Sequence, residues 1–242
     1  MADVWVNVSS TTSAATGDAV APSYAASVSN IETLGNWMAE HDAGTGGWSS
    51  GSMSLVSWPS YSGSSRKFYT AFSNYGGERY HVTFSDDVNS TNFLYDTWVY
   101  IVDSAQSIGN LEFDLNQVMP NGQTMIFGFQ CDGYSGTWDF TKNAGSATSP
   151  RDTWVHSGAK CNPRSWAVNR WHHVQISYSR NSSGWATYKS VWLDGAEQGI
   201  NATVYDAFAL GWGPVLLANY QVDGIGSGSV TTFLDDFRVY RW

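Results

Sequence analysis

The sequence is built largely from short runs in which apolar and polar residues alternate, with turn-forming residues between one run and the next. Residues 110–118, NLEFDLNQV, are one such run. Side chains of a β-strand point to opposite faces with a period of two residues, so this run presents one apolar and one polar face. Pairs such as Asn121-Gly122 and Asp194-Gly195 accept the positive φ of tight hairpin turns. The pattern predicts an antiparallel all-β protein.

Nine runs are expected to form strands: residues 52–58, 67–72, 79–85, 92–102, 110–118, 124–131, 171–179, 188–195 and 232–242. Nine or more antiparallel strands in one chain of 242 residues favour a two-sheet antiparallel jelly-roll sandwich over a small barrel. We expect residues 31–242 to form this single domain and residues 1–30, with Val4, Val6 and Val8 alternating, to form a linker or an edge strand.

Two further segments are not expected to be strands. Residues 31–41 are the one candidate for a helix of more than about two turns. Residues 43–51, AGTGGWSSG, are too rich in glycine for regular structure and are expected to form a loop that carries Trp48.

Composition narrows the class of ligand. Aromatic residues make up 15% of the chain and charged residues only 14%, which suits a neutral polar ligand such as a sugar. The formal net charge of −9 would repel nucleic acids and anionic membranes. No run of 18 apolar residues is present, so no membrane-spanning helix is expected.

The two cysteines, Cys131 and Cys161, lie 30 positions apart and lack the short spacing of a zinc knuckle. In a chain rich in Ser, Thr and Gly they are typical of a disulfide in an exported protein whose leader has been removed, and the alternative is two reduced core cysteines. The segment between them is expected to be a long loop. Its rings, Tyr134 and Trp138, would stack on sugars, and Asp132 and Asp139 would accept hydrogen bonds from hydroxyl groups.

The last third of the chain resembles a known superfamily. The order W-H-H-V at 171–174, L-D-G at 193–195 and D-D-F-R-V-Y at 235–240 is similar to laminin G-like and wider concanavalin A-like jelly rolls. The resemblance covers residues 165–242 and implies a concave sheet that binds or cleaves polysaccharides. It also implies a structural calcium ion at Asp235 or Asp236, with a partner such as Asn36 or Asp42, although pairing with Arg238 explains the two acids equally.

Within that superfamily, NLEFDLNQV is similar to the E-x-D-x-x-E strand motif of family 16 and family 7 retaining glucanases. Glu112 matches the nucleophile and Asp114 the central acid, but Gln117 stands at the acid/base position and cannot transfer the proton. The resemblance therefore implies a site that holds sugar without cutting it, with Asn116 beside Gln117 in its floor. Other residues could supply a second acid: Asp132, Asp139, Glu40, His41 and Asp42.

Two adjacent histidines complete the candidates. His172 is in phase with the apolar residues of its strand and is expected in the core, whereas His173 shares the polar face and could bind ligand or act as a base. Gln130, near the end of the run 124–131, is a further candidate ligand residue. The sequence thus predicts a lectin-like domain for a neutral polysaccharide such as a β-glucan. The alternatives are a retaining glycoside hydrolase with Glu112 as nucleophile, and a non-catalytic adhesion domain.

Overall fold

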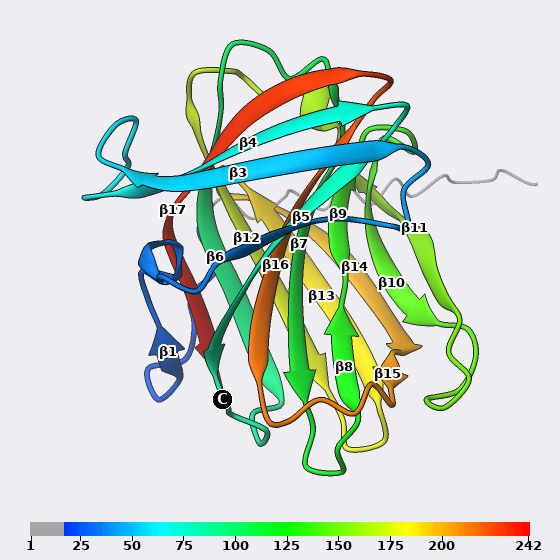
Figure 1. The fold of residues 1–242 in the computed structure, drawn as a ribbon. Helices are drawn as coiled ribbons and strands as arrows, with labels where there is room; N and C mark the ends of the chain where they lie inside the picture. The colour runs from blue at the N-terminus through cyan, green and yellow to red at the C-terminus, as the bar shows by residue number, and fades with distance from the viewer. Residues whose placement is uncertain (1–16) are drawn as a thin grey trace, which may run out of the picture.

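A computed structural model describes residues 17–242, so the predicted alternation of Val4, Val6 and Val8 lies outside the described residues. Two antiparallel sheets face each other as a sandwich, which confirms the predicted fold class (Figure 1). Sheet A has the strand order β14-β13-β12-β6-β17-β4-β3, with β1 paired to β17. Its strands are β1 (Ala26–Val28), β3 (Trp48–Val56), β4 (Ser65–Ser73), β6 (Asn92–Ile101), β12 (Trp171–Arg180), β13 (Trp185–Leu193), β14 (Ala196–Tyr205) and β17 (Gly228–Arg241).

Sheet B has the order β11-β10-β9-β7-β16-β5-β2, with β8 paired to β7 and β15 paired to β8. Its strands are β2 (Met38–His41), β5 (Gly77–Ser85), β7 (Ile108–Val118), β8 (Thr124–Phe127), β9 (Phe129–Asp132), β10 (Thr137–Asn143), β11 (Asp152–Lys160), β15 (Ala207–Phe208) and β16 (Leu216–Gly224). In the described part of the chain the only helices are two short 3₁₀ turns, Ile31–Thr33 and Pro163–Ser165. Neither is long and apolar enough to cross a membrane.

The core lies between the sheets and is filled by the apolar side of each alternating strand. From β7, Leu111, Phe113 and Leu115 are fully buried. The Phe113 ring packs edge-on against Tyr95 of sheet A, with ring centroids 6.3 Å apart. A fully buried Phe or Leu contributes about 1.5–3 kcal/mol relative to an exposed one. Many of the aromatic residues therefore serve the core.

Three predictions of local structure were wrong. The candidate helix 31–41 is the 3₁₀ turn Ile31–Thr33 followed by β2, and the expected loop 43–51 ends early because β3 begins at Trp48. The segment between the cysteines is the hairpin of β10 and β11. In β10, Trp138 and Phe140 are buried in the core. These two apolar residues alternate with polar ones in TWDFTKN, so the sequence did contain a strand signal here.

The predicted disulfide is confirmed. Cys131 in β9 is bonded to Cys161, with a Cα–Cα distance of 5.3 Å, which excludes the alternative of two reduced cysteines. The bond ties β9 to the end of β11, across β10. It therefore fixes the edge of sheet B.

Part of the segment assigned to a linker or edge strand contacts sheet A. Ala26–Val28 pairs with β17, and the Ala19 amide donates to Gln175 Oε1 at 2.8 Å.

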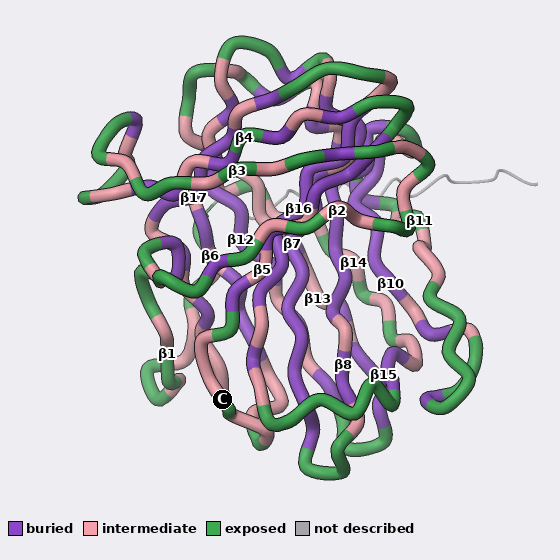
Figure 2. The backbone as a smooth tube through the Cα atoms, in the orientation of Figure 1, coloured by how far each residue is buried: buried purple, intermediate pink, exposed green. Residues whose placement is uncertain are grey.

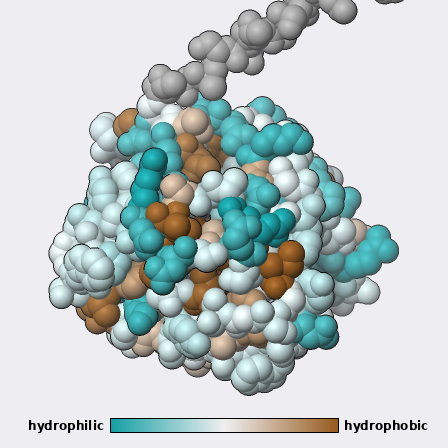
Figure 3. Space-filling view, turned by 90° about the horizontal axis from the view of Figure 1, so that it is seen from above, coloured by the Kyte–Doolittle hydropathy of each residue, from teal (hydrophilic) through white to brown (hydrophobic). Residues whose placement is uncertain are grey.

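On the face turned toward the top of Figure 1, hydrophobic areas are small and interrupted by hydrophilic surface (Figure 3).

Candidate functional site

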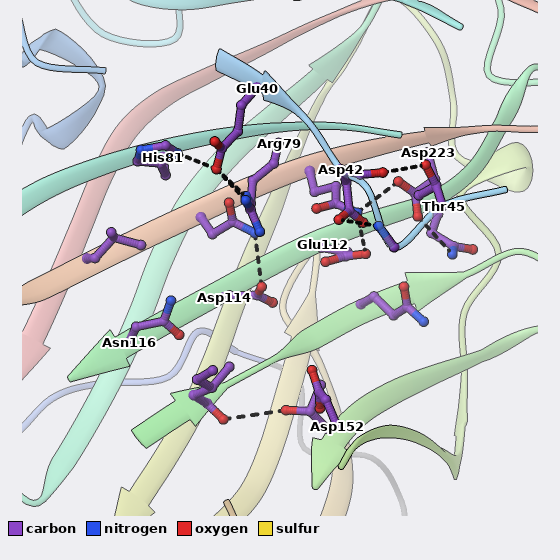
Figure 4. Close-up of a pocket in the computed structure, with 18 of the residues that line it drawn as sticks. Glu40, Asp42, Thr45, Arg79, His81, Glu112, Asp114, Asn116, Asp152 and Asp223 are labelled. Atoms are coloured by element: carbon purple, nitrogen blue, oxygen red, sulfur yellow. Dashed lines mark hydrogen bonds and ion pairs between the residues drawn. The ribbon is translucent and has the colours of Figure 1, made fainter. Parts of the chain in front are cut away.

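A groove of about 540 Å³ lies on the face of sheet B that points away from sheet A (Figure 4). Strands β7 and β16 form its floor, β2 and β5 form one wall, and β8 to β11 with the loop before β16 form the other. Its lining residues are Glu40, Asp42, Gly44, Thr45, Arg79, His81, Asn110, Glu112, Asp114, Asn116, Ile126, Gln130, Thr141, Asp152, Trp154, Leu210, Trp212, Leu217, Asn219, Gln221 and Asp223.

The floor follows from strand alternation and pairing. The polar face of β7 carries Glu112, Asp114 and Asn116, and antiparallel pairing sets Asn219 of β16 opposite Asp114 and Gln221 opposite Glu112. All five side chains are buried although they are polar. Figure 2 shows β7 and β16 buried along nearly their whole length. The walls therefore shield a hydrogen-bonding floor from bulk water.

Asp114 is held at the centre of this floor by a bend in the adjacent chain. At Gly128, between β8 and β9, a Cβ would lie 2.4 Å from Thr141 Cγ2, so only glycine fits there. The bend lets the Phe129 amide donate to Asp114 Oδ1 at 3.0 Å. Asn219 Nδ2 donates to the other oxygen at 3.0 Å. Burial nevertheless raises the pKa of Asp114 to about 7.

Three carboxyl groups surround one amide nitrogen beside Asp114. Gln221 Nε2 lies 3.0 Å from Glu112 Oε1, 2.9 Å from Asp223 Oδ1 and 3.0 Å from Asp42 Oδ2. An amide nitrogen has only two hydrogens, so it cannot satisfy three acceptors at once. Burial raises the pKa of Asp223 to about 7. Burial, with the charges of Asp223, Asp114 and Asp42, also raises the pKa of Glu112. Glu112 and Asp223 therefore retain protons at pH values where exposed carboxyls are ionised.

Two amide oxygens in the groove have no donor. Asn116 is 8% exposed and Asn219 4% exposed, yet the Oδ1 atom of each lacks a hydrogen-bond partner. Buried polar atoms are nearly always paired, so each of these oxygens would gain a missing hydrogen bond if its amide turned toward a hydroxyl group in the groove.

The walls differ in chemistry. On one side, Arg79 forms an ion pair with Glu40, and His81 Nδ1 lies 3.8 Å from Glu40 Oε1. Burial lowers the pKa of His81, which favours the neutral imidazole. The other side carries Trp154 of β11 and Trp212, a residue that is 41% exposed. The groove thus combines indole rings with hydrogen-bonding groups.

The structure brings together Glu112, Asp114, Asn116 and Gln130, four of the predicted ligand residues. Of the alternative acids, Glu40 and Asp42 also line the groove, whereas His41 binds Ser49 Oγ at 2.9 Å. The lining residues that the sequence reasoning missed include Trp212, Asn219, Gln221 and Asp223. Three of them lie in LLANYQVDG, whose alternation was a usable strand signal.

Two predicted ligand residues are structural. Gln117 is out of phase with Glu112, so it points into the sandwich, where its Oε1 accepts from Arg180 Nε at 2.6 Å and its Nε2 donates to the Ser90 carbonyl at 3.0 Å. Trp138 is fully buried and stacks on Phe129, so it cannot be a platform for sugar.

The remaining candidates lie outside the groove. Tyr134 is exposed in the turn after β9, and its hydroxyl lies 3.4 Å from the Gly224 carbonyl. Asp132 and Asp139 lie on the groove face of sheet B but are absent from the groove lining. None of the three therefore lines the groove, although Asp132 lies opposite the lining residue Asn110 of β7.

Both histidines of β12 are paired within sheet A. His172 is buried and bonded to Asp194 Oδ2 at 2.9 Å, as expected for a core histidine. His173 is on the outer face of sheet A, stacked on Trp98 and bonded to Asp96 Oδ1 at 2.7 Å. Burial lowers the pKa of His173, but the hydrogen bond and charge of Asp96 outweigh it and the pKa is raised. His173 is therefore not a base for the groove.

The predicted calcium pair does not fit the ion. Asp235 accepts hydrogen bonds from donors in a nearby loop and from the Asp236 amide at 2.7 Å, so donors occupy its lone pairs. The loop donors are Ser60 Oγ, the Tyr61 amide, and the amide and hydroxyl of Ser62. Asp236 forms an ion pair with Arg238 at 3.2 Å, and Asp42 lies in the groove. The pair anchors a loop.

No protein-family model matches the sequence, and no curated protein sequence matches it. Among solved structures, the cellulose-induced protein Cip1 is similar over 88% of this chain and 96% of its own, with a TM-score of 0.52 and 12% identity. A structure from work on promiscuous carbohydrate-binding modules of the β-sandwich superfamily has a TM-score of 0.42 and 10% identity, with 86% of this chain and 58% of that chain covered. The family 11 carbohydrate-binding module from Clostridium thermocellum has a TM-score of 0.38 and 10% identity, over 88% and 93% of the two chains.

At these identities the likeness shows the β-sandwich fold alone. The laminin G-like membership and the glucanase motif inferred from the sequence are not confirmed by these comparisons.

Proposed function

We propose that the groove on sheet B binds a polysaccharide, with the sugar chain lying over the floor made by β7 and β16. One observation carries the proposal: the same groove contains two amide oxygens without a hydrogen-bond donor, on Asn116 and Asn219, and two indole rings, those of Trp154 and Trp212. Sugar hydroxyls donate to such oxygens, and the C–H faces of sugar rings pack on indoles.

A neutral polymer such as a β-glucan suits this groove better than an acidic one. Six carboxyl groups line the groove: Glu40, Asp42, Glu112, Asp114, Asp152 and Asp223. They would repel uronate groups, whereas the raised pKa values of Asp114 and Asp223 let these carboxyls both donate to and accept from hydroxyls. The disulfide suits an oxidising, extracellular setting, where such polymers occur.

Binding is testable by native-gel retardation and titration calorimetry on mixed-linkage β-glucan, cellulose oligomers, xyloglucan, mannan and alginate. Trp154→Ala and Trp212→Ala should each weaken binding, since stacking on an indole contributes beyond simple burial. Trp58→Ala is the matched control, because Trp58 is 81% exposed and lies outside the groove. Failure of the wild-type protein to bind any polymer in the panel would refute the proposal.

A second candidate function, a retaining glycoside hydrolase, is favoured by one observation. Glu112 Oε1 and Asp223 Oδ1 both lie within 3.0 Å of Gln221 Nε2, so they are at most about 6 Å apart, a range that includes the 5–5.5 Å typical of retaining enzymes. Asp223 could thus provide the acid that Gln117 cannot. Reducing-sugar release that disappears in both Glu112→Gln and Asp223→Asn would establish turnover, whereas retention without release would leave a binding domain.

A further inference from the structure

A second cluster of polar side chains lies on the groove face of sheet B, beyond the groove itself. Asp132 ends β9, Asp139 lies in β10 and His156 in β11, so three neighbouring strands each contribute one residue. Strand register sets Asp139 opposite His156. One potential ligand atom from each residue lies within 4.8 Å of the others.

The spacing of these atoms is close to that of metal ligands. His156 Nδ1 lies 2.8 Å from Asp139 Oδ2. When two ligand atoms each bind a tetrahedral zinc ion at about 2.1 Å, they are about 3.4 Å apart, so this pair would need to open by about 0.6 Å. Asp132 Oδ1 accepts from the Tyr134 amide at 2.7 Å and Oδ2 from the Ser135 amide at 3.0 Å, so Oδ2 keeps a second lone pair for an ion, unlike the fully occupied Asp235. The imidazole and the two carboxylates could therefore close on one ion with small side-chain movements. Thr137 Oγ1, which lies 2.6 Å from Asp139 Oδ1, orients that carboxylate.

The charges of the cluster favour a cation. Asp139 is fully buried and Asp132 nearly so. Across residues 17–242, no lysine or arginine forms an ion pair with either acid, and His156 is the only basic partner. Buried carboxylates without a balancing charge are costly. The His156 side chain is 67% exposed, so an ion from solution can reach the open side.

We propose that Asp132, Asp139 and His156 bind one divalent transition-metal ion, with Zn²⁺ preferred over Ca²⁺. Calcium requires six to eight oxygen ligands, whereas an imidazole with carboxylates suits zinc and similar ions. Three protein ligands leave a position for water or for another ligand. Because Asp132 follows the groove residue Gln130 by two positions, the ion would lie about 7 Å farther along the same strand face.

The test is calorimetric titration of the full chain with Zn²⁺ after removal of metals with a chelator, and with Ca²⁺ in parallel. We expect saturable binding of one Zn²⁺ per chain, with much weaker Ca²⁺ binding. His156→Gln should weaken Zn²⁺ binding at least about tenfold, and Asp139→Asn should abolish it. Asp103→Asn, which removes an exposed acid on another part of the surface, is the matched control and should bind as the wild type does.

Folding does not confound this test, because His156 is exposed and its replacement leaves no cavity. If Asp139→Asn does not fold, His156→Gln decides the question, with perturbation of the wild-type His156 imidazole NMR signals by Zn²⁺ as a second readout. Absence of saturable Zn²⁺ binding would overturn the proposal. Equal binding by the wild type and His156→Gln would show an adventitious ion elsewhere, and equal affinity for Ca²⁺ would overturn the stated preference.

Discussion

Replacement of Asp114 by asparagine should remove a pH-dependent loss of stability that this carboxyl imposes on the fold. Burial raises the Asp114 pKa from 3.8 to about 7. Between these pH values the folded state holds a proton that the unfolded state has released, so the free energy of unfolding falls as the pH rises. Below pH 4 both states are protonated, and above pH 7 both are ionised.

The expected size of the effect follows from that interval. A rise from 3.8 to about 7 corresponds to about 4 kcal/mol, at about 1.4 kcal/mol for each pH unit. Asparagine fits the site because the unpartnered Oδ1 of Asn219 can rotate to accept from the new amide. The Phe129 amide can still donate to the oxygen at position 114.

Urea unfolding followed by tryptophan fluorescence at several pH values from 4 to 8 would measure the effect. The wild-type free energy of unfolding should fall more steeply with pH than that of Asp114→Asn, and the variant should be the more stable protein at pH 7. Asp103→Asn is the control for loss of one exposed negative charge and should keep the wild-type slope. Parallel slopes for the wild type and Asp114→Asn would refute the reasoning, because the carboxyl would then titrate normally in the groove.

Three further predictions concern residues outside the groove. Replacing Cys131 and Cys161 together by serine should lower the free energy of unfolding by about 3–4 kcal/mol, because the disulfide restricts the conformations of the unfolded chain. Urea unfolding measures the change, and an unchanged free energy of unfolding would contradict this explanation. Gln117→Ala should lower the free energy of unfolding by about 1–3 kcal/mol, because Arg180 loses a buried hydrogen-bond acceptor. Polysaccharide binding should be unchanged, and a loss of binding in the folded variant would show that Gln117 belongs to the binding site. Trp138→Ala should cost about 3–5 kcal/mol in thermal or urea unfolding, since the ring fills the core, and a near-neutral effect would contradict its burial.

The sequence by itself determined the type of fold and the composition of one strand of the site. Alternation with a period of two is a local property, so NLEFDLNQV specifies that Glu112, Asp114 and Asn116 share a face opposite the core. The same rule excludes Gln117 from that face. The disulfide between Cys131 and Cys161 was also predictable, because the composition of the chain is typical of exported proteins.

Only the tertiary structure decided which strands lie side by side. Strand β16 follows β7 by about a hundred residues, yet it pairs with β7 and places Gln221 against Glu112 and Asn219 against Asp114. Pairing partners depend on how the whole chain crosses between the two sheets, which no local pattern encodes. Likewise, Trp138 was expected in a loop, and alternation in TWDFTKN could place it on one side of a strand but not show that this side faces the core, because either face of a strand can be the buried one until its neighbours are in place.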